Sequence, residues 1–152
     1  MNIKIKTVLT IVHHAHHEQR YNDSIPYIAH LMMVANHVAQ RHADPELVKI
    51  ALLHDIVEDT DWTVPQVREL CGDRIADAVD ALTYRKGKET YFGDYLPRVI
   101  TNADAIIVKW SDIQCNLTSA KLYSPEKRNN LINRRYKQAL DYLRENAFIY
   151  SE

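Results

Sequence analysis

The sequence contains very little glycine, with three residues among 152. A Walker A loop and a dinucleotide-binding GxGxxG turn both need closely spaced glycines, which bring backbone N–H groups to a phosphate. Neither motif is present, so any phosphate that this chain binds must be held by other means.

Other absences narrow the class of protein further. Two cysteines, Cys71 and Cys115, do not form a disulfide framework and are interpreted as free thiols in a reducing compartment. No apolar run approaches the length of a membrane span, and the apolar segment near the N-terminus ends in histidines instead of a signal-peptide cleavage site. A formal net charge of −1 provides no overall field to attract nucleic acid. We therefore expect a cytoplasmic protein with no membrane and no nucleic-acid partner; the oligomeric state cannot be inferred.

The hydrophobic pattern is helical nearly throughout, and no segment alternates as a strand. Asp44 and Thr63 are predicted N-caps, and each is followed within two residues by a proline, Pro45 or Pro65. Pro97 is expected to end or kink a helix. The prediction is a single all-α domain over residues 1–152, with about six to eight helices, a core at 15–120 and a C-terminal helix at 125–149. The other predicted helices cover residues 3–20, 27–42, 45–59, 64–71, 73–84 and 103–122, with a further helical segment at 89–100.

In the stretch LLHDIVEDTDWT, one histidine and three carboxylates lie within six residues, beside apolar side chains: His54, Asp55, Glu58 and Asp59. On a continuous helix over 45–59, spacings of three and four residues would put these side chains next to one another. Carboxylates crowded in a dry place repel each other, and a divalent cation would remove that cost. An acidic helix end that faces solvent, with His54 as an ordinary half-buried histidine, fits this stretch equally well.

Two other segments offer further metal ligands. Asp112 lies on the apolar segment VKWSDIQCNLTSA, in one stripe with Asn116 and Ser119, and His30 lies in the apolar segment IPYIAHLMMVA. Alone, each is more typical of an ordinary helix face or a core histidine. Together with His54 and Asp55 they provide two imidazoles and two carboxylates, which suit manganese, iron or zinc better than calcium.

The order of PYIAH, LLHDIVEDT and VKWSDIQCN along the chain resembles the HD superfamily of metal-dependent phosphohydrolases. Over about residues 15–120 it is similar to the RelA/SpoT-type hydrolases of the alarmone guanosine 3′,5′-bis(diphosphate) and to their small stand-alone relatives. AHHEQR and AVDALT extend the similarity. The resemblance implies that His30, His54, Asp55 and Asp112 bind a divalent metal, most often Mn²⁺. It also implies that Glu58 and Asp59 activate and orient the attacking water, and that Asn116 and Ser119 contact the nucleotide.

The chain departs from that family where the family contacts guanine. The Arg-Lys pair that precedes PYI in the alarmone hydrolases corresponds here to Tyr21 and Asn22, with Arg20 just before them. Tyr21 could stack on a base and Asn22 could form a hydrogen bond with one. Leu31 replaces the family's proline and Ile113 replaces its arginine. The metal residues thus match the family pattern, whereas the residues expected to bind substrate differ from it.

The expected function is metal-dependent hydrolysis of a small-molecule nucleotide, with the alarmone as the leading substrate. Two alternatives stay open: the same chemistry on another nucleotide or phosphate monoester, and a catalytically silent nucleotide-binding regulatory module. A structural metal site is less favoured, because neither cysteine is placed to complete it. RRYK at 134–137 is interpreted as a solvated helix face. The candidates for binding phosphate are basic residues, with the loop 84–88 foremost: Arg20, Arg85, Lys86, Lys88, Lys109 and Lys121.

Overall fold

The computed structural model describes residues 2–120, 125–126, 130 and 135–147. Within these ranges the chain is helical with no β-strand; Arg20 and Pro26 form one isolated bridge. The predicted all-α class is confirmed. None of the helices in the described ranges has the length and apolar character needed to cross a membrane. The elements are α1 (Ile5–Ala15), α2 (Tyr27–Arg41), α3 (Pro45–Leu53), α4 (Ile56–Asp59), α5 (Val64–Cys71), α6 (Asp73–Ala81), the π-helical turn η1 (Tyr91–Tyr95), α7 (Leu96–Val99), α8 (Ala103–Ser119) and α10 (Lys137–Ala147).

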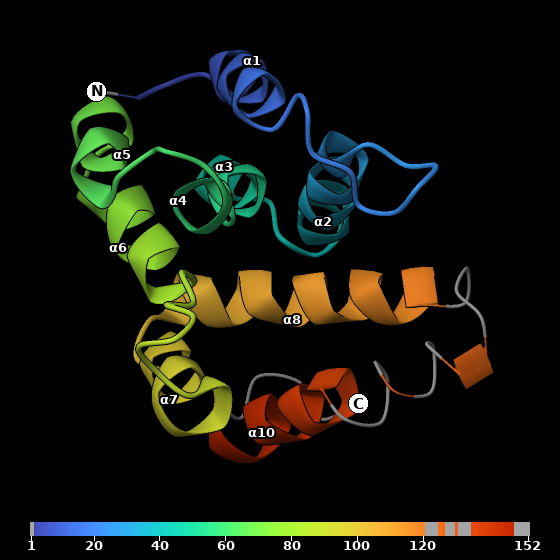
Figure 1. Cartoon of the computed structure of the whole chain (residues 1–152). Helices are drawn as coiled ribbons and strands as arrows, with labels where there is room; N and C mark the ends of the chain where they lie inside the picture. Colours follow the sequence, from blue (N-terminus) through green and yellow to red (C-terminus); the bar gives the residue numbers. More distant parts are fainter. Residues whose placement is uncertain (1, 121–124, 127–129, 131–134, 148–152) are drawn as a thin grey trace.

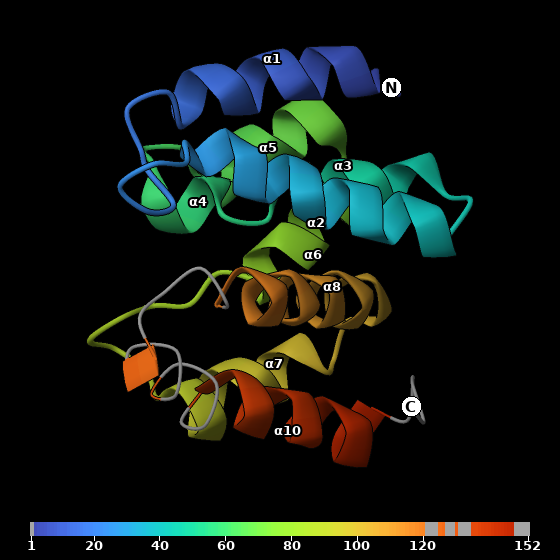
Figure 2. The ribbon, with the colours of Figure 1, turned by 90° about the vertical axis from the view of Figure 1, so that its right-hand side faces the viewer.

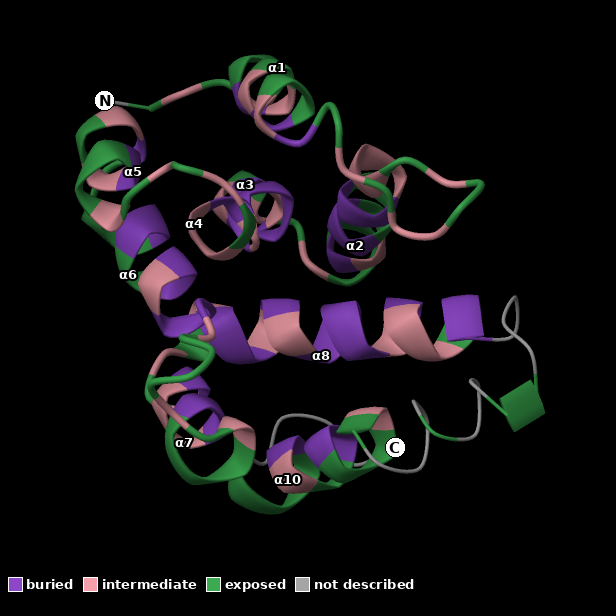
Figure 3. Cartoon of the chain, viewed as in Figure 1, coloured by how far each residue is buried: buried purple, intermediate pink, exposed green. Residues whose placement is uncertain are grey.

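Helix α8 runs through the middle of the bundle, with α2, α3 and α6 on one side and α7 and α10 on the other (Figure 1). Figure 2 shows the same layering after a quarter turn. Buried residues recur along the whole of α8 and α3 (Figure 3), including Val108, Ile113, Ile50 and Leu53. Burial of this apolar surface is the main favourable term that holds the helices together.

The two predicted N-caps are confirmed. The Asp44 side chain accepts a hydrogen bond from the N–H of Glu46 at 3.0 Å. Thr63 and Gln66 form a reciprocal capping box, in which each side chain accepts a hydrogen bond from the backbone N–H of the other residue. Such caps satisfy backbone donors that have no partner within the helix, so α3 and α5 each begin at a defined residue.

The predicted helix over 45–59 is wrong in one respect that matters for the site. The chain leaves the helical path at Asp55, whose φ of −106° and ψ of 1° lie in the sparsely populated bridge region. Helices α3 and α4 are therefore separate, and His54 and Asp55 lie in the turn between them. Spacing along one helix does not account for how these two side chains meet.

The predicted helix over 3–20 is also shorter, since α1 ends at Ala15. His17 directs Nδ1 to the carbonyl of His14 at 2.7 Å, and the chain then turns back so that Tyr27 N–H donates to Gln19 O at 2.9 Å. At the other end of the chain, the predicted helix 125–149 is observed over Lys137–Ala147. Its residues 127–129, 131–134 and 148–149 lie outside the described ranges, as does Lys121.

Pro97 lies in the first turn of α7, directly after η1. A proline has no N–H to donate to the preceding turn. The turn before it is wider than an α-helix, and Tyr95 N–H donates to Thr90 O at 3.0 Å. Pro97 thus marks a change of helix type between two helical segments. This arrangement places Tyr91 and Tyr95 beside α8.

Candidate functional site

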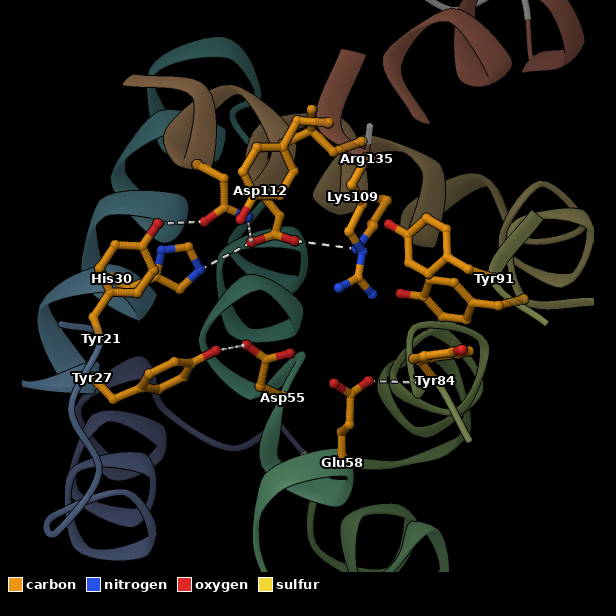
Figure 4. Close-up of a pocket in the computed structure, with 14 residues that line it drawn as sticks. Tyr21, Tyr27, His30, Asp55, Glu58, Tyr84, Tyr91, Lys109, Asp112 and Arg135 are labelled. Atoms are coloured by element: carbon orange, nitrogen blue, oxygen red, sulfur yellow. Dashed lines mark hydrogen bonds and ion pairs between the residues drawn. The ribbon is translucent and has the colours of Figure 1, made fainter. Parts of the chain in front are cut away.

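The structure brings together four side chains from three separate parts of the sequence (Figure 4). His30 comes from α2, His54 and Asp55 from the α3–α4 turn, and Asp112 from α8. His30 Nε2 lies 2.9 Å from Asp112 Oδ1, and His54 Nε2 lies 3.0 Å from Asp55 Oδ2 and 3.5 Å from Asp112 Oδ1. Nitrogen and oxygen atoms of His30, His54 and Asp55 all lie within 4.8 Å of one another. The cluster therefore has the dimensions of a metal site.

His54 is oriented by the backbone. Its Nδ1 lies 2.6 Å from the carbonyl oxygen of Ala51, which can only accept a hydrogen bond, so Nδ1 carries the proton. Nε2 is buried, faces the two carboxylates and has no well-aligned hydrogen bond to a described residue. A ring held through one nitrogen, with the other directed at carboxylates, is typical of histidine that binds a metal. The donor set of imidazole nitrogens and carboxylate oxygens fits a first-row divalent cation.

The charges of the cluster are strongly coupled. Burial alone would raise the pKa of Asp112, but Lys109 and the two imidazoles outweigh it and hold that pKa well below its usual range. Burial likewise opposes ionisation of Asp55, yet His54 lowers the pKa of this carboxyl to about 2. Burial would also lower the pKa of His54, and the two carboxylates raise it well above its usual value. Both carboxylates thus stay ionised, and positive charge must balance them.

Tyr27 lies on α2 one turn before His30, and its hydroxyl donates a hydrogen bond to Asp55 Oδ2. Burial, followed by the charge of Asp55, raises the pKa of Tyr27, so it remains a donor at any ordinary pH. Its ring also lies 5.6 Å from the ring of His30, measured between centroids. Tyr27 therefore fixes the direction of one carboxylate and contacts one imidazole.

We expect Tyr27→Phe to weaken metal binding about 10- to 100-fold while leaving the fold intact, because partners that orient metal ligands have effects of this size. Isothermal titration with Mn²⁺ measures the change. Tyr142→Phe on α10, outside this cluster, is the matched control. Unchanged affinity in Tyr27→Phe would show that Asp55 needs no orienting hydroxyl.

Glu58 and Asp59 follow the cluster on α4. Carboxylate oxygens of Asp55, Glu58 and Asp59 lie within 4.8 Å of one another. Glu58 is partly buried, and its Oε1 accepts a hydrogen bond from Tyr84 N–H at 2.7 Å. Burial, helped by Asp55, raises the pKa of Glu58 to about 7, and the same two causes raise the pKa of Asp59. A carboxyl group with a pKa near neutrality is suited to accept and return a proton.

This raised pKa makes stability depend on pH. Glu58 titrates near pH 4.5 when unfolded and near pH 7 when folded, so the folded chain holds the proton more tightly. The stabilising contribution of protonated Glu58 is fully present below pH 4.5 and is lost as pH rises through about 7, about 3 kcal/mol in all. In chelator, urea unfolding should show the wild type losing this stability relative to Glu58→Gln between pH 5 and 8. Parallel pH curves for the two proteins would mean that the folded pKa is not raised.

The cluster forms one side of a pocket with about 700 Å³ of empty space, including the part open to solvent. Among the described residues, six of the chain's nine tyrosines line it. Tyr84 and Tyr91 lie on the side of the pocket opposite His30 (Figure 4), and together with Tyr95 they form an aromatic wall with ring centroids 5.1 to 5.5 Å apart. Lys109 lies between this wall and the cluster, 3.3 Å from Asp112 Oδ2 and 5.2 Å from the Tyr95 ring. The pocket is thus acidic at one side and aromatic with a cation at the other.

Only two of the five predicted substrate contacts line this pocket. Tyr21 stacks on the His30 ring at 4.6 Å between centroids and donates its hydroxyl to Asn116 Oδ1 at 2.5 Å. Ser119 is buried against Met33 instead. Arg20 and Asn22 hold the turn before α2: Arg20 Nη2 donates to Asp23 O, and Asn22 Oδ1 accepts from the N–H groups of Ser24 and Ile25. Neither of these two side chains lines the pocket.

The basic loop 84–88 contributes Tyr84 to the pocket and none of its cations. Arg85 forms an ion pair with Asp80 at 2.6 Å, and Lys86 and Lys88 are exposed. Among the phosphate-binding candidates within the described residues, Lys109 alone lines the pocket. Asp59 is exposed and lies outside the lining as well.

The sequence analysis missed several lining residues. Tyr27 precedes the predicted ligand His30 by three residues on the same helix, so helical spacing could have identified it. Tyr84, Tyr91 and Tyr95 meet the cluster only through the packing of η1 on the bundle, which local spacing does not reveal. The segment before α10 supplies two more residues, Arg135 and Tyr136, where a solvated face was expected.

Comparison with known proteins shows the family to which the chain belongs. The family described as HD domain matches residues 9–91, more than half of the chain, and the chain belongs to that family. It is 31% identical over 130 residues to a guanosine-3′,5′-bis(diphosphate) 3′-pyrophosphohydrolase of Haemophilus influenzae, a match that covers 80% of this chain and 19% of the relative. It is 33% identical over 123 residues to the enzyme of that name from Aquifex aeolicus, covering 76% of this chain and 18% of the relative. This chain therefore spans about a fifth of the length of these relatives.

The fold also matches a solved structure. A structure described as "A metazoan ortholog of SpoT hydrolyzes ppGpp and plays a role in starvation responses" superposes with a TM-score of 0.76. The match covers 96% of this chain and 89% of that one, at 24% sequence identity. At this identity the likeness establishes the shared helical fold over nearly the whole chain.

Proposed function

We propose that this chain is a metal-dependent phosphohydrolase that removes the 3′-diphosphate of guanosine 3′,5′-bis(diphosphate), yielding guanosine 5′-diphosphate and pyrophosphate. The observation that carries the proposal is the pocket in which His30, His54, Asp55 and Asp112 meet beside Glu58. The relatives named as 3′-pyrophosphohydrolases, similar over three quarters or more of this chain, support the choice of substrate.

The four clustered side chains are proposed to hold one divalent cation, with Mn²⁺ as the ion. Two imidazoles and two carboxylates fit such a first-row ion. Once bound, the cation would lower the pKa of a water molecule and draw charge from a phosphoryl oxygen. Tyr27 would keep Asp55 directed into the cluster by donating its hydroxyl. Lys109, 3.3 Å from Asp112, would offset part of the negative charge that substrate phosphates bring.

Glu58 is proposed to accept the proton from the attacking water. Its pKa of about 7 lets it do so near neutral pH and then return the proton to the leaving oxygen. Tyr84 N–H, bound to Oε1, keeps the carboxylate in place and leaves the other oxygen for the water. Asp59, more exposed and next to Glu58, would orient that water. Asn116 and Tyr21 would contact the nucleotide from the opposite side of the pocket.

A second candidate is the same hydrolysis on a nucleotide with another base. It is favoured because the side chains of Asn22 and Arg20 form hydrogen bonds within the turn before α2 and do not line the pocket. Tyr21, with its hydroxyl on Asn116, offers a ring face that does not distinguish guanine from adenine.

The test is kcat/KM for a panel of nucleotides with Mn²⁺, containing guanosine and adenosine 3′,5′-bis(diphosphate) and the corresponding 3′-monophosphates. The proposed function predicts that the guanosine bis(diphosphate) is the best substrate and that a chelator abolishes its turnover. Preference for the adenosine compound would show that the substrate carries adenine in place of guanine, while the proposed reaction would stand. If the metal-loaded protein hydrolysed no member of the panel, the remaining hypothesis would be a catalytically silent nucleotide-binding module.

A further inference from the structure

The pocket contains a second cationic side chain, Arg135, which has no role in the proposed reaction. Arg135 lies just before α10 and lines the pocket together with Tyr136. Its guanidinium carbon is 4.3 Å from the centroid of the Tyr91 ring and 5.9 Å from that of Tyr84. Figure 4 shows the side chain reaching into the pocket toward the side on which Glu58 and Asp55 lie.

Arg135 differs from the neighbouring cation in its partners. Lys109 is paired with Asp112 and enclosed by Tyr91 and Tyr95. Arg135 makes no hydrogen bond or ion pair to any residue that the structure describes. Its guanidinium lies over the rings of Tyr84 and Tyr91. An arginine that rests on an aromatic face keeps its in-plane N–H groups available. Arg135 is therefore a positioned donor whose N–H groups make no hydrogen bond within the part of the chain that the structure describes.

The position of Arg135 also indicates which part of a substrate it would meet. Tyr84, on whose ring it lies, holds Glu58 through the backbone N–H at 2.7 Å. Arg135 is thus on the side of the pocket where water would be activated, next to the phosphoryl group under attack. A planar guanidinium can bind two phosphate oxygens at once, which suits the outer phosphate of a diphosphate.

We propose that Arg135 binds the terminal phosphate of the 3′-diphosphate that is cleaved off, and so determines the preference for a diphosphate over a monophosphate. This inference rests on the proposed function. It concerns a residue outside the range 9–91 over which the HD domain family matches. Arg135, just before α10, is then part of the substrate site.

The experiment compares wild type, Arg135→Gln, Arg135→Lys and the matched control Arg144→Gln. Arg144 lies on α10 with its guanidinium 5.3 Å from the Trp110 ring, outside the pocket. Steady-state kinetics use guanosine 3′,5′-bis(diphosphate) and guanosine 5′-monophosphate 3′-diphosphate, with inorganic pyrophosphate as product inhibitor. Loss of one charge-assisted contact should raise KM for both substrates, and Ki for pyrophosphate, about 10- to 100-fold in Arg135→Gln. Arg135→Lys should lose less, and Arg144→Gln should match the wild type.

Two results would overturn the inference. In the first, KM and Ki of Arg135→Gln equal those of Arg144→Gln. In the second, the rise in KM of Arg135→Gln disappears with guanosine 5′-monophosphate 3′-diphosphate, which would place Arg135 beside the 5′-diphosphate. Titration of inorganic pyrophosphate into the metal-loaded proteins separates this test from the proposed function. If the wild type turns over no nucleotide, the proposed function fails, yet weaker pyrophosphate binding by Arg135→Gln alone would still support the role of Arg135.

Discussion

Glu58→Gln is expected to lower kcat by about 10²- to 10⁴-fold, the usual contribution of a general base, while metal binding and the fold persist. Glutamine keeps the size of the side chain and can still accept the hydrogen bond from Tyr84 N–H, but it cannot take a proton from water. The change thus removes proton transfer without opening a cavity.

Three measurements on purified Glu58→Gln separate these effects: kcat, bound metal per chain and the melting temperature. Glu69→Gln, an exposed change on α5, controls for the loss of one surface carboxylate. A kcat equal to that of the wild type would mean that the water needs no carboxylate base, and the role given to Glu58 would be withdrawn.

Asp112→Asn should remove metal and activity together. Asp112 lies within 3.5 Å of His30, His54 and Lys109, and it is buried together with the two histidines. Changes to residues that merely orient metal ligands cost 10- to 100-fold in affinity, so loss of a ligand should cost about 100-fold or more. Asparagine preserves the volume, which avoids the larger disruption that alanine would cause in a buried ionic cluster.

Metal content by mass spectrometry after dialysis, together with kcat, tests this expectation. Asp104→Asn is the control, since Asp104 lies in the first turn of the same helix and pairs with Arg74 away from the pocket. Full metal occupancy in Asp112→Asn would exclude Asp112 from the ligand set.

The sequence predicted well those features that depend on neighbours along one helix. The capping residues Asp44 and Thr63 begin α3 and α5 as expected, and Asp112 and Asn116 lie one turn apart with Asn116 Nδ2 3.3 Å from Asp112 Oδ1. The apolar context of His30 correctly indicated a buried side chain. Each of these follows from short-range geometry, which sequence spacing encodes.

The aromatic wall could not be predicted in the same way. Tyr84 and Tyr91 line the same pocket as Asp112 only because η1 and α7 pack beside α8, and no local pattern specifies that packing. Arg135 reaches the same wall from 40 or more residues further along the chain. The break at Asp55 was missed for a related reason. Its backbone departs from the helix where His54 and two carboxylates converge, a tertiary demand that overrides helix propensity.

The proposed reaction is metal-dependent cleavage of a 3′-diphosphate, in which Glu58 accepts the proton of the attacking water. The most direct measurement is a time course of guanosine 3′,5′-bis(diphosphate) with Mn²⁺, quenched with excess chelator and resolved by anion-exchange chromatography. We predict equal amounts of guanosine 5′-diphosphate and pyrophosphate, and neither product from a Glu58→Gln/Asp59→Asn double variant that still binds metal. Release of orthophosphate in place of pyrophosphate, or equal turnover by the double variant, would contradict the account.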